Sequence, residues 1–310
     1  MLLQLDINIH DMENNSHHNE NPSGRLFISI LLNGLITLVE IVGGIFSNSL
    51  ALISDAIHNL SDTLALLLAW LANNFSGRRP DARRTFGYKR FEILSAFINA
   101  SVLTAISIYL IYEAILRFLH PEPVRSGLMF IIALIGLVAN LVSVLFLHRD
   151  SNKNLNIKAA YMHLLGDTLS SVAVVGGAVL IYYAKVLWVD TLLTLIISIV
   201  IIFQAYKILR ESVDILMQST PANLDLDEIR VYLEKQPMIR NIHHVHCWRL
   251  QDHDILFEAH IETSEDLLLS DTNKLLKEVE EILRQKFHIT HTTLQVEFDV
   301  CGDKSMIKQP

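Results

Sequence analysis

Six apolar stretches separated by short polar joints constrain this chain most. Each is long enough for an α-helix to cross the hydrocarbon core of a bilayer, which takes about 20 residues. The stretches lie at 26–46, 50–74, 91–119, 127–148, 157–183 and 187–210. They predict an α-helical membrane protein with six transmembrane helices. The first 24 residues are polar and lack a basic start followed by an apolar run, so we expect no cleaved signal peptide.

The charged residues divide the chain into a membrane part and a soluble part. Residues 211–310 hold 19 of the 33 acidic and 10 of the 25 basic residues, a net charge of −9. We therefore expect a polar tail at 1–24, a membrane domain at 25–212, a cytosolic domain at 213–300 and a short tail at 301–310. Neither part has the basic face that nucleic acid requires, and no phosphate-binding glycine loop indicates a nucleotide.

The soluble part changes periodicity three times along its length. Helical spacing at 225–236 is followed by alternation at 242–250 and 255–263, an amphipathic stretch at 271–287 and alternation at 293–298. This αββαβ order predicts a small α+β domain with two helices on one face of a three-stranded sheet. Asp225 and either Ser270 or Asp271 are the expected N-caps of its helices.

Basic residues mark one side of the membrane. Six basic residues follow the second stretch and three follow the fourth, whereas the loops on the other side hold few. These nine are Arg78, Arg79, Arg83, Arg84, Lys89 and Arg90, then Arg149, Lys153 and Lys158. The positive-inside rule then predicts that both termini lie in the cytosol. The short loops and compact tails are typical of a bacterial protein of the inner membrane.

Ionisable residues inside the second and fifth stretches are the main functional signal. Charged side chains are costly in a bilayer, so an intramembrane acid or histidine is a candidate functional group. His58 and Asp62 stand four residues apart, as do His163 and Asp167, and the two segments share the pattern H-x-L-x-D-T-L. Residues at i and i+4 lie on one helix face. We expect one shared site, with Ser61 and Gly166 small enough to let the two helices approach.

Two imidazoles and two carboxylates favour a zinc site. Tetrahedral nitrogen and oxygen coordination suits Zn²⁺. A single membrane histidine is as readily a hydrogen-bonded packing residue, but four ligands at duplicated spacing favour a metal. Asp55, one turn before His58, is either a proton carrier or a residue that supports the ligands.

These residues carry a resemblance to a known family. The run from Ser49 to Ala56 (SLALISDA), the two His/Asp pairs and the loop from Thr85 to Tyr88 (TFGY) make the chain similar to the zinc-exporting branch of the cation diffusion facilitators. The resemblance implies a homodimeric antiporter in the lipid bilayer that exchanges Zn²⁺ for H⁺. It places the transport site on His58, Asp62, His163 and Asp167. Manganese-type relatives tend to have Asp at the position of His58, so the histidine indicates zinc, with cadmium accompanying it.

The resemblance also implies a metal-binding, metallochaperone-like cytosolic domain. On neighbouring antiparallel strands, His246 and His260 would face each other with Glu297 nearby. These three residues fit metal-binding positions of relatives, and His291 lies near a fourth; solvated surface histidines are the competing interpretation. Arg90 and Asp214 fit the positions of a charge contact in the family's dimer. The competing interpretation of Arg90 is an ordinary solvated basic loop.

The same residues also fit other functions. The His/Asp groups would also serve a proton-coupled carrier of an organic solute, or an exporter of Co²⁺, Fe²⁺ or Ni²⁺. An intramembrane zinc protease would need His-Glu-x-x-His, which is absent, and we expect no enzyme. The loop at 78–90 offers Asp81 and no histidine, so we expect no second metal site there. The tail containing His10, His17 and His18 either delivers metal or is simply solvated.

Overall fold

The computed structural model describes residues 22–76, 80–148, 155–251, 254–300 and 305–307. They form two compact units, one made of Met1–Asn73 with Ser95–Leu209 and the other of Asn74–Leu94 with Arg210–Pro310. The membrane helices are α1 (Pro22–Ser47), α2 (Leu50–Ser76), α3 (Arg90–Leu119), α4 (Ser126–His148), α5 (Leu155–Ala184) and α6 (Trp188–Leu216). The soluble elements are α7 (Leu226–Leu233), β1 (Ile239–Gln251), β2 (Asp254–Thr263), α8 (Leu269–Phe287) and β3 (His291–Glu297).

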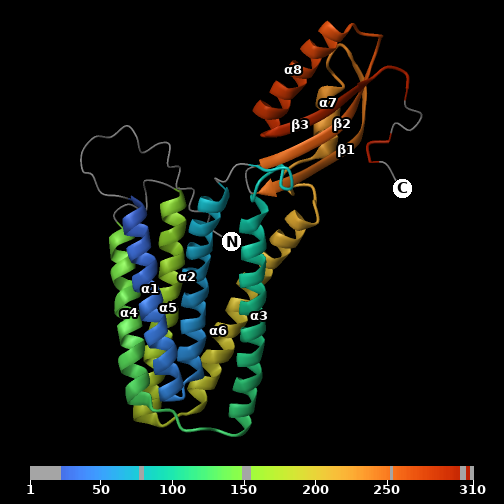
Figure 1. Ribbon diagram of the computed structural model, residues 1–310. Helices are drawn as coiled ribbons and strands as arrows, with labels where there is room; N and C mark the ends of the chain where they lie inside the picture. Colours follow the sequence, from blue (N-terminus) through green and yellow to red (C-terminus); the bar gives the residue numbers. More distant parts are fainter. Residues whose placement is uncertain (1–21, 77–79, 149–154, 252–253, 301–304, 308–310) are drawn as a thin grey trace. The chain divides into compact units, whose positions relative to one another are not determined.

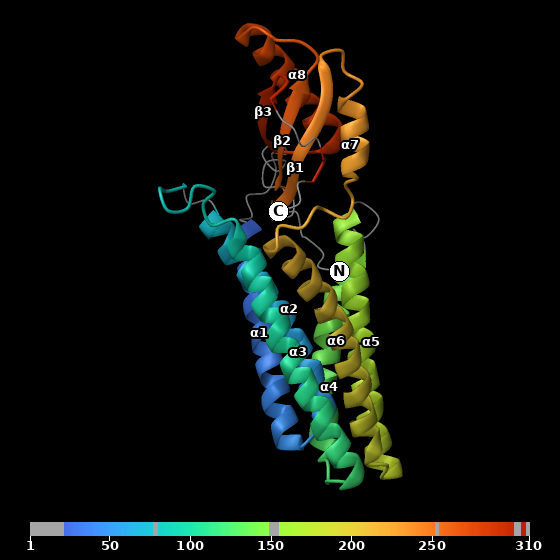
Figure 2. The same cartoon turned by 90° about the vertical axis from the view of Figure 1, so that its right-hand side faces the viewer.

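The six long helices confirm the predicted helical membrane fold. Helix α4 packs along α5, and α1 packs along α4 (Figures 1 and 2). Within the described residues, α3, α6, the segment Ser126–Leu145 of α4 and the segment Tyr161–Ala184 of α5 are long and apolar enough to span a membrane. The described apolar part of α1, Asn33–Ser47, is shorter.

A tight turn joins α1 to α2. Asn48 has a positive φ of 56°, the left-handed conformation that commonly ends a helix. Ser49 then caps α2, because its Oγ accepts a hydrogen bond from the backbone N of Leu52 at 3.1 Å. Gly44 lets the helices meet here, since a Cβ on it would lie 2.6 Å from Ile53.

A carboxylate from α6 completes the cap of α2. Asp190 is 2% exposed and accepts hydrogen bonds from Ser49 Oγ at 2.5 Å, Leu50 N at 2.9 Å and Ala51 N at 3.3 Å. The first backbone N–H groups of a helix have no partner within it and carry partial positive charge. Asp190 therefore fixes the start of α2, the helix that carries His58 and Asp62, to α6.

The soluble unit has the predicted αββαβ order. Its sheet has the strand order β1-β2-β3, with β1 and β2 antiparallel and β2 and β3 parallel. A parallel pair needs a long crossover, which α8 supplies. Helix α8 buries a stripe at positions spaced three or four residues apart. Together with α7 it covers one face of the sheet around a single core.

One of the expected helix caps is confirmed and the other is wrong. The Asp225 side chain accepts hydrogen bonds from the backbone N–H groups of Asp227 and Glu228, as an N-cap should. Helix α8 instead begins after Leu268, which makes no side-chain cap. Ser270 and Asp271 therefore lie inside its first turn, where Asp271 still favours the positive end of the helix dipole.

Candidate metal centres

Four ionisable side chains of α2 and α5 meet inside the helical bundle. His58 and Asp62 share one face of α2, and His163 and Asp167 share one face of α5. His58 Nε2 lies 3.2 Å from Asp167 Oδ1 on the other helix and 3.7 Å from Asp62 Oδ2 on its own. His163 Nε2 lies 3.3 Å from Asp62 Oδ2 and 3.7 Å from Asp167 Oδ2. Each imidazole thus faces carboxylates from both helices.

The nitrogen–oxygen separations suit tetrahedral coordination. Ligand atoms about 2.0–2.1 Å from a Zn²⁺ ion stand about 3.3 Å apart at tetrahedral angles. The four nitrogen–oxygen distances, 3.2 to 3.7 Å, bracket that value. His58, Asp62 and Asp167 each offer a ligand atom within 4.8 Å of the other two. His163 does not join that group, so its side chain would have to shift to bind the same ion.

The cluster is open on one side. Exposed side-chain fractions are 11% for His58 and 9% for Asp167, but 33% for Asp62 and 40% for His163. Each helix therefore contributes one buried and one accessible side chain to the cluster.

Hydrogen bonds from neighbouring helices hold the ligand helices in place. Asp55 accepts hydrogen bonds from Ser170 Oγ at 2.5 Å and Ser171 Oγ at 3.3 Å, which ties α2 to α5. Asn99 of α3 donates to Ser61 Oγ, and Asn59 of α2 donates to the buried carboxylate of Glu40 on α1.

The small residue on α5 does not mark a tight contact with α2. A Cβ on Gly166 would meet no atom of the described residues within 4 Å. The expectation for Gly166 is therefore wrong, because the hydrogen bonds of Asp55 lie on the contact between α2 and α5 and Gly166 does not.

A second cluster lies on the sheet of the soluble unit. His243 on β1 pairs with His260 on β2, and Glu297 on β3 reaches both. Glu297 Oε1 lies 2.7 Å from His260 Nδ1, and Glu297 Oε2 lies 3.5 Å from His243 Nε2. Three adjacent strands thus bring two imidazoles and a carboxylate together.

The hydrogen bonds of Asn241 determine which nitrogen of His243 faces the cluster. Asn241 Nδ2 donates to Glu234 Oε1 at 3.2 Å, which leaves Oδ1 facing His243 Nδ1 at 3.0 Å. An amide oxygen only accepts, so Nδ1 carries the proton and Nε2 presents a lone pair. Nε2 and the facing Glu297 Oε2 are both buried and have no hydrogen-bond partner among the described residues. Two buried acceptors that face each other are suited to a cation.

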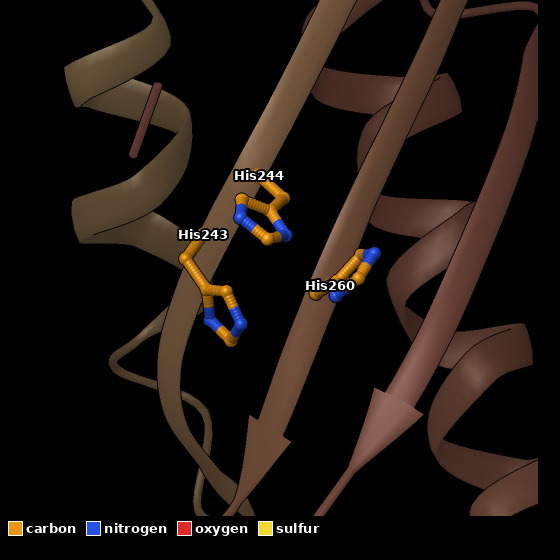
Figure 3. Close-up of side chains that lie close together, drawn as sticks. All are labelled: His243, His244 and His260. Carbon is orange, nitrogen blue, oxygen red and sulfur yellow. The ribbon is translucent and has the colours of Figure 1, made fainter. Parts of the chain in front are cut away.

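The expected pairing of His246 with His260 is wrong. His246 pairs with Glu258 and is exposed, because a bulge shifts the register of β1 between His243 and His246. The bulge also carries His244, so that β1 presents His243 and His244 next to each other, with His260 on β2 (Figure 3). Sequence reasoning missed His243 and His244 because it assumed regular alternation; the consecutive histidines in an otherwise alternating strand were the available signal.

The other expected site residues lie apart from both clusters. His291 pairs with Leu256 at the start of β3, and its ring contacts Phe86 edge-on at 6.1 Å between centroids. Among the described residues no ion pair joins Arg90 to Asp214 within one chain. His10, His17 and His18 lie outside the described residues.

In the loop before α3, the Asp81 side chain accepts hydrogen bonds from backbone N–H groups. Its Oδ1 accepts hydrogen bonds from the backbone N of Arg83 at 2.7 Å and of Arg84 at 2.8 Å, and these bonds lower the pKa of its carboxyl.

A bundle of apolar helices in which four ionisable side chains face one another, joined to a small α+β domain, is typical of a multi-pass membrane transporter of cations. Comparison with known families specifies the class further. Residues 26–217 match the family described as the cation efflux transmembrane domain, and residues 221–299 match the cytoplasmic domain of cation efflux proteins. The chain belongs to the cation diffusion facilitator family, which is a transporter family and not an enzyme family.

Bacterial relatives match nearly the whole chain. The zinc transporter ZitB of Escherichia coli is 38% identical over 94% of this chain and 93% of the relative. The metal cation efflux system protein CzcD of Cupriavidus metallidurans is 36% identical over 92% and 90%. A cadmium, cobalt and zinc/H(+)-K(+) antiporter of Bacillus subtilis is 37% identical over 95% and 96%.

Proposed function

We propose that this protein exports Zn²⁺ from the cytosol in exchange for protons, with His58, Asp62, His163 and Asp167 as the transport site. The observation that carries the proposal is the crossed arrangement of these four side chains, in which each imidazole nitrogen lies 3.2 to 3.7 Å from a carboxylate oxygen of each helix. The names of the relatives support zinc as cargo, and the B. subtilis relative is also named for cadmium and cobalt.

Proton exchange follows from the chemistry of the ligands. A metal binds neutral imidazole and ionised carboxylate, so loading the site displaces the protons that these groups hold. Histidine has an unperturbed pKa of about 6.5 and changes charge near neutral pH. A site that opens in turn to the cytosol and to a more acidic exterior therefore loads Zn²⁺ on one side and protons on the other.

We further propose that the protein works as a homodimer in the bacterial inner membrane, with both termini in the cytosol. The basic joints after α2 and α4 support this orientation. The charge contact expected of Arg90 and Asp214 would then join two copies.

The cytosolic cluster is the proposed regulatory site. We assign His243, His260 and Glu297 as ligands of a second Zn²⁺, supported by the facing buried acceptors Nε2 and Oε2. Metal that binds the folded domain stabilises it by mass action and would favour association of two copies.

Flux measurements in inverted membrane vesicles test the transport proposal. Uptake of ⁶⁵Zn driven by an inward-acidic pH gradient should disappear in Asp62→Ala and in Asp167→Ala, and also when the gradient is collapsed. Thr168→Ala is the matched control, because the Thr168 hydroxyl bonds back to Leu164 O of its own helix at 2.8 Å. A carrier of an organic solute would instead retain proton movement without zinc, and zinc uptake by both Asp variants at the control rate would exclude the proposed site.

A further inference from the structure

The bulge in β1 gives the chain an unusual pair of neighbouring histidines. Successive side chains of a regular strand point to opposite faces of the sheet. In the pairing of β1 with β2, His243 lies opposite His260 and His246 lies opposite Glu258. Strand β1 therefore has one more residue than β2 between these two pairs. His244 lies in this bulge with a positive φ of 50°.

The consequence is that His243 and His244 both approach His260. Ring centroids are 5.3 Å apart for His243 and His244, 4.7 Å for His244 and His260, and 5.5 Å for His243 and His260. One ligand nitrogen from each of the three lies within 4.8 Å of the others. Figure 3 shows the three rings gathered over β1 and β2.

The C-terminal segment supports this conformation. The bulge takes the backbone N–H groups of His244 and Val245 out of the pairing with β2. His244 N instead donates to Ser305 O at 3.3 Å and Val245 N donates to Met306 O at 2.8 Å. A positive φ is unfavourable for a residue with a Cβ, and such conformations persist where the surrounding structure enforces them, often at functional sites.

We propose that His244 is the fourth ligand of the cytosolic metal site, so that one chain supplies three imidazoles and one carboxylate from His243, His244, His260 and Glu297. The inference rests on the proposed metal binding by the other three residues. A metal held by these four residues would be four-coordinate, without a position for water, which is typical of structural zinc sites. The metal would fasten the bulge of β1 to β2 and β3.

The test uses the full-length protein in detergent with Asp62→Ala and Asp167→Ala, so that the membrane cluster no longer binds metal. His244→Gly is the informative variant, because glycine adopts a positive φ without strain and preserves the bulge. His246→Ala is the matched control, since His246 is exposed and two residues away. Zinc affinity is measured by competition with a chromophoric chelator, and the number of bound imidazoles by X-ray absorption.

We expect His244→Gly to weaken zinc binding by about tenfold or more and to reduce the bound imidazoles from three to two. Its metal-free melting temperature should equal or exceed that of the parent, and His246→Ala should bind like the parent. Unchanged affinity and three imidazoles in His244→Gly would exclude His244 as a ligand. If His243→Ala and His260→Ala also left zinc affinity unchanged, the proposed cytosolic site itself would be wrong. If only those two variants lost zinc affinity, the role of His244 alone would be overturned.

Discussion

Asn241 Oδ1 lies 3.0 Å from His243 Nδ1 and thereby determines which nitrogen of His243 faces Glu297. The amide is itself oriented by Glu234. Metal-binding histidines commonly have such a partner on the second ring nitrogen.

Replacing Asn241 should therefore weaken the cytosolic site without removing a ligand. We expect Asn241→Ala to lower zinc affinity by about 10- to 100-fold, the usual effect of losing such a partner. Chelator competition on protein lacking Asp62 and Asp167 measures this directly. Asn241→Asp retains an acceptor oxygen for His243 Nδ1 but loses the donor to Glu234, so it should bind zinc more weakly than the parent and more tightly than Asn241→Ala. Equal affinity in Asn241→Ala and the parent would mean that His243 needs no orientation.

Asp55 should act as a brace between α2 and α5. Asp55→Asn retains an oxygen that accepts from Ser170, so we expect zinc flux to keep its dependence on the pH gradient. Asp55→Ala leaves the hydroxyls of Ser170 and Ser171 without their acceptor, which costs about 1–3 kcal/mol and should lower the melting temperature. Zinc flux measured at two pH gradients distinguishes a brace from a proton carrier. If Asp55 carried protons, zinc flux in Asp55→Asn would no longer respond to the pH gradient.

Metal choice should depend on His58. His58→Asp replaces an imidazole with a carboxylate and makes the ligand set harder, which suits Mn²⁺ better than Zn²⁺. We expect the ratio of ⁶⁵Zn to ⁵⁴Mn flux to fall by about tenfold or more. His148→Asp changes a histidine at the end of α4 that belongs to neither cluster and serves as the control. An unaltered ratio in His58→Asp would show that His58 does not select the cargo.

The cap between α2 and α6 should contribute strongly to stability. Asp190→Ala leaves Ser49 Oγ and two backbone N–H groups without an acceptor, so we expect a loss of about 2 kcal/mol or more. Asp190→Asn retains one acceptor oxygen and should lose less. Thermal denaturation in detergent gives the melting temperatures of the parent and the two variants. Equal melting temperatures of Asp190→Ala and the parent would contradict the role of the cap.

Cys247 should resist thiol reagents until the soluble unit opens. Burial raises the pKa of its thiol from 9.0 to about 11, so at pH 8 only about one thiol in a thousand is ionised. In a Cys301→Ser background, maleimide labelling should be slow and should accelerate on unfolding. The Cys247 thiol holds its proton more tightly in the folded than in the unfolded state. The contribution of the protonated thiol to the free energy of unfolding is therefore complete below pH 9 and declines towards pH 11. Cys247→Ala should lack that decline, and fast labelling of the native protein would contradict the burial.

The helical part and the membrane cluster were predictable because their signals are local. The spacing of His58 with Asp62 and of His163 with Asp167 sets each pair on one helix face, and duplication of the motif links the two. The αββαβ order followed in the same way from changes of periodicity.

The cytosolic cluster was less predictable because strand register is not a local property. A bulge of one residue determines which histidine of the segment His243 to His246 faces His260, and nothing in alternation alone reveals it. Asp190 was missed for a similar reason, since it lies 141 residues from Ser49, its hydrogen-bond partner.

The unequal exposure of the four membrane ligands implies an order of events. Asp62 and His163 belong to different helices, yet both are accessible, whereas His58 and Asp167 are enclosed. We expect an arriving ion to exchange some of its coordinated water molecules for the accessible pair first and the remainder for the enclosed pair afterwards. Dehydration of the cargo is thereby divided between two smaller barriers, and departure would retrace them in reverse.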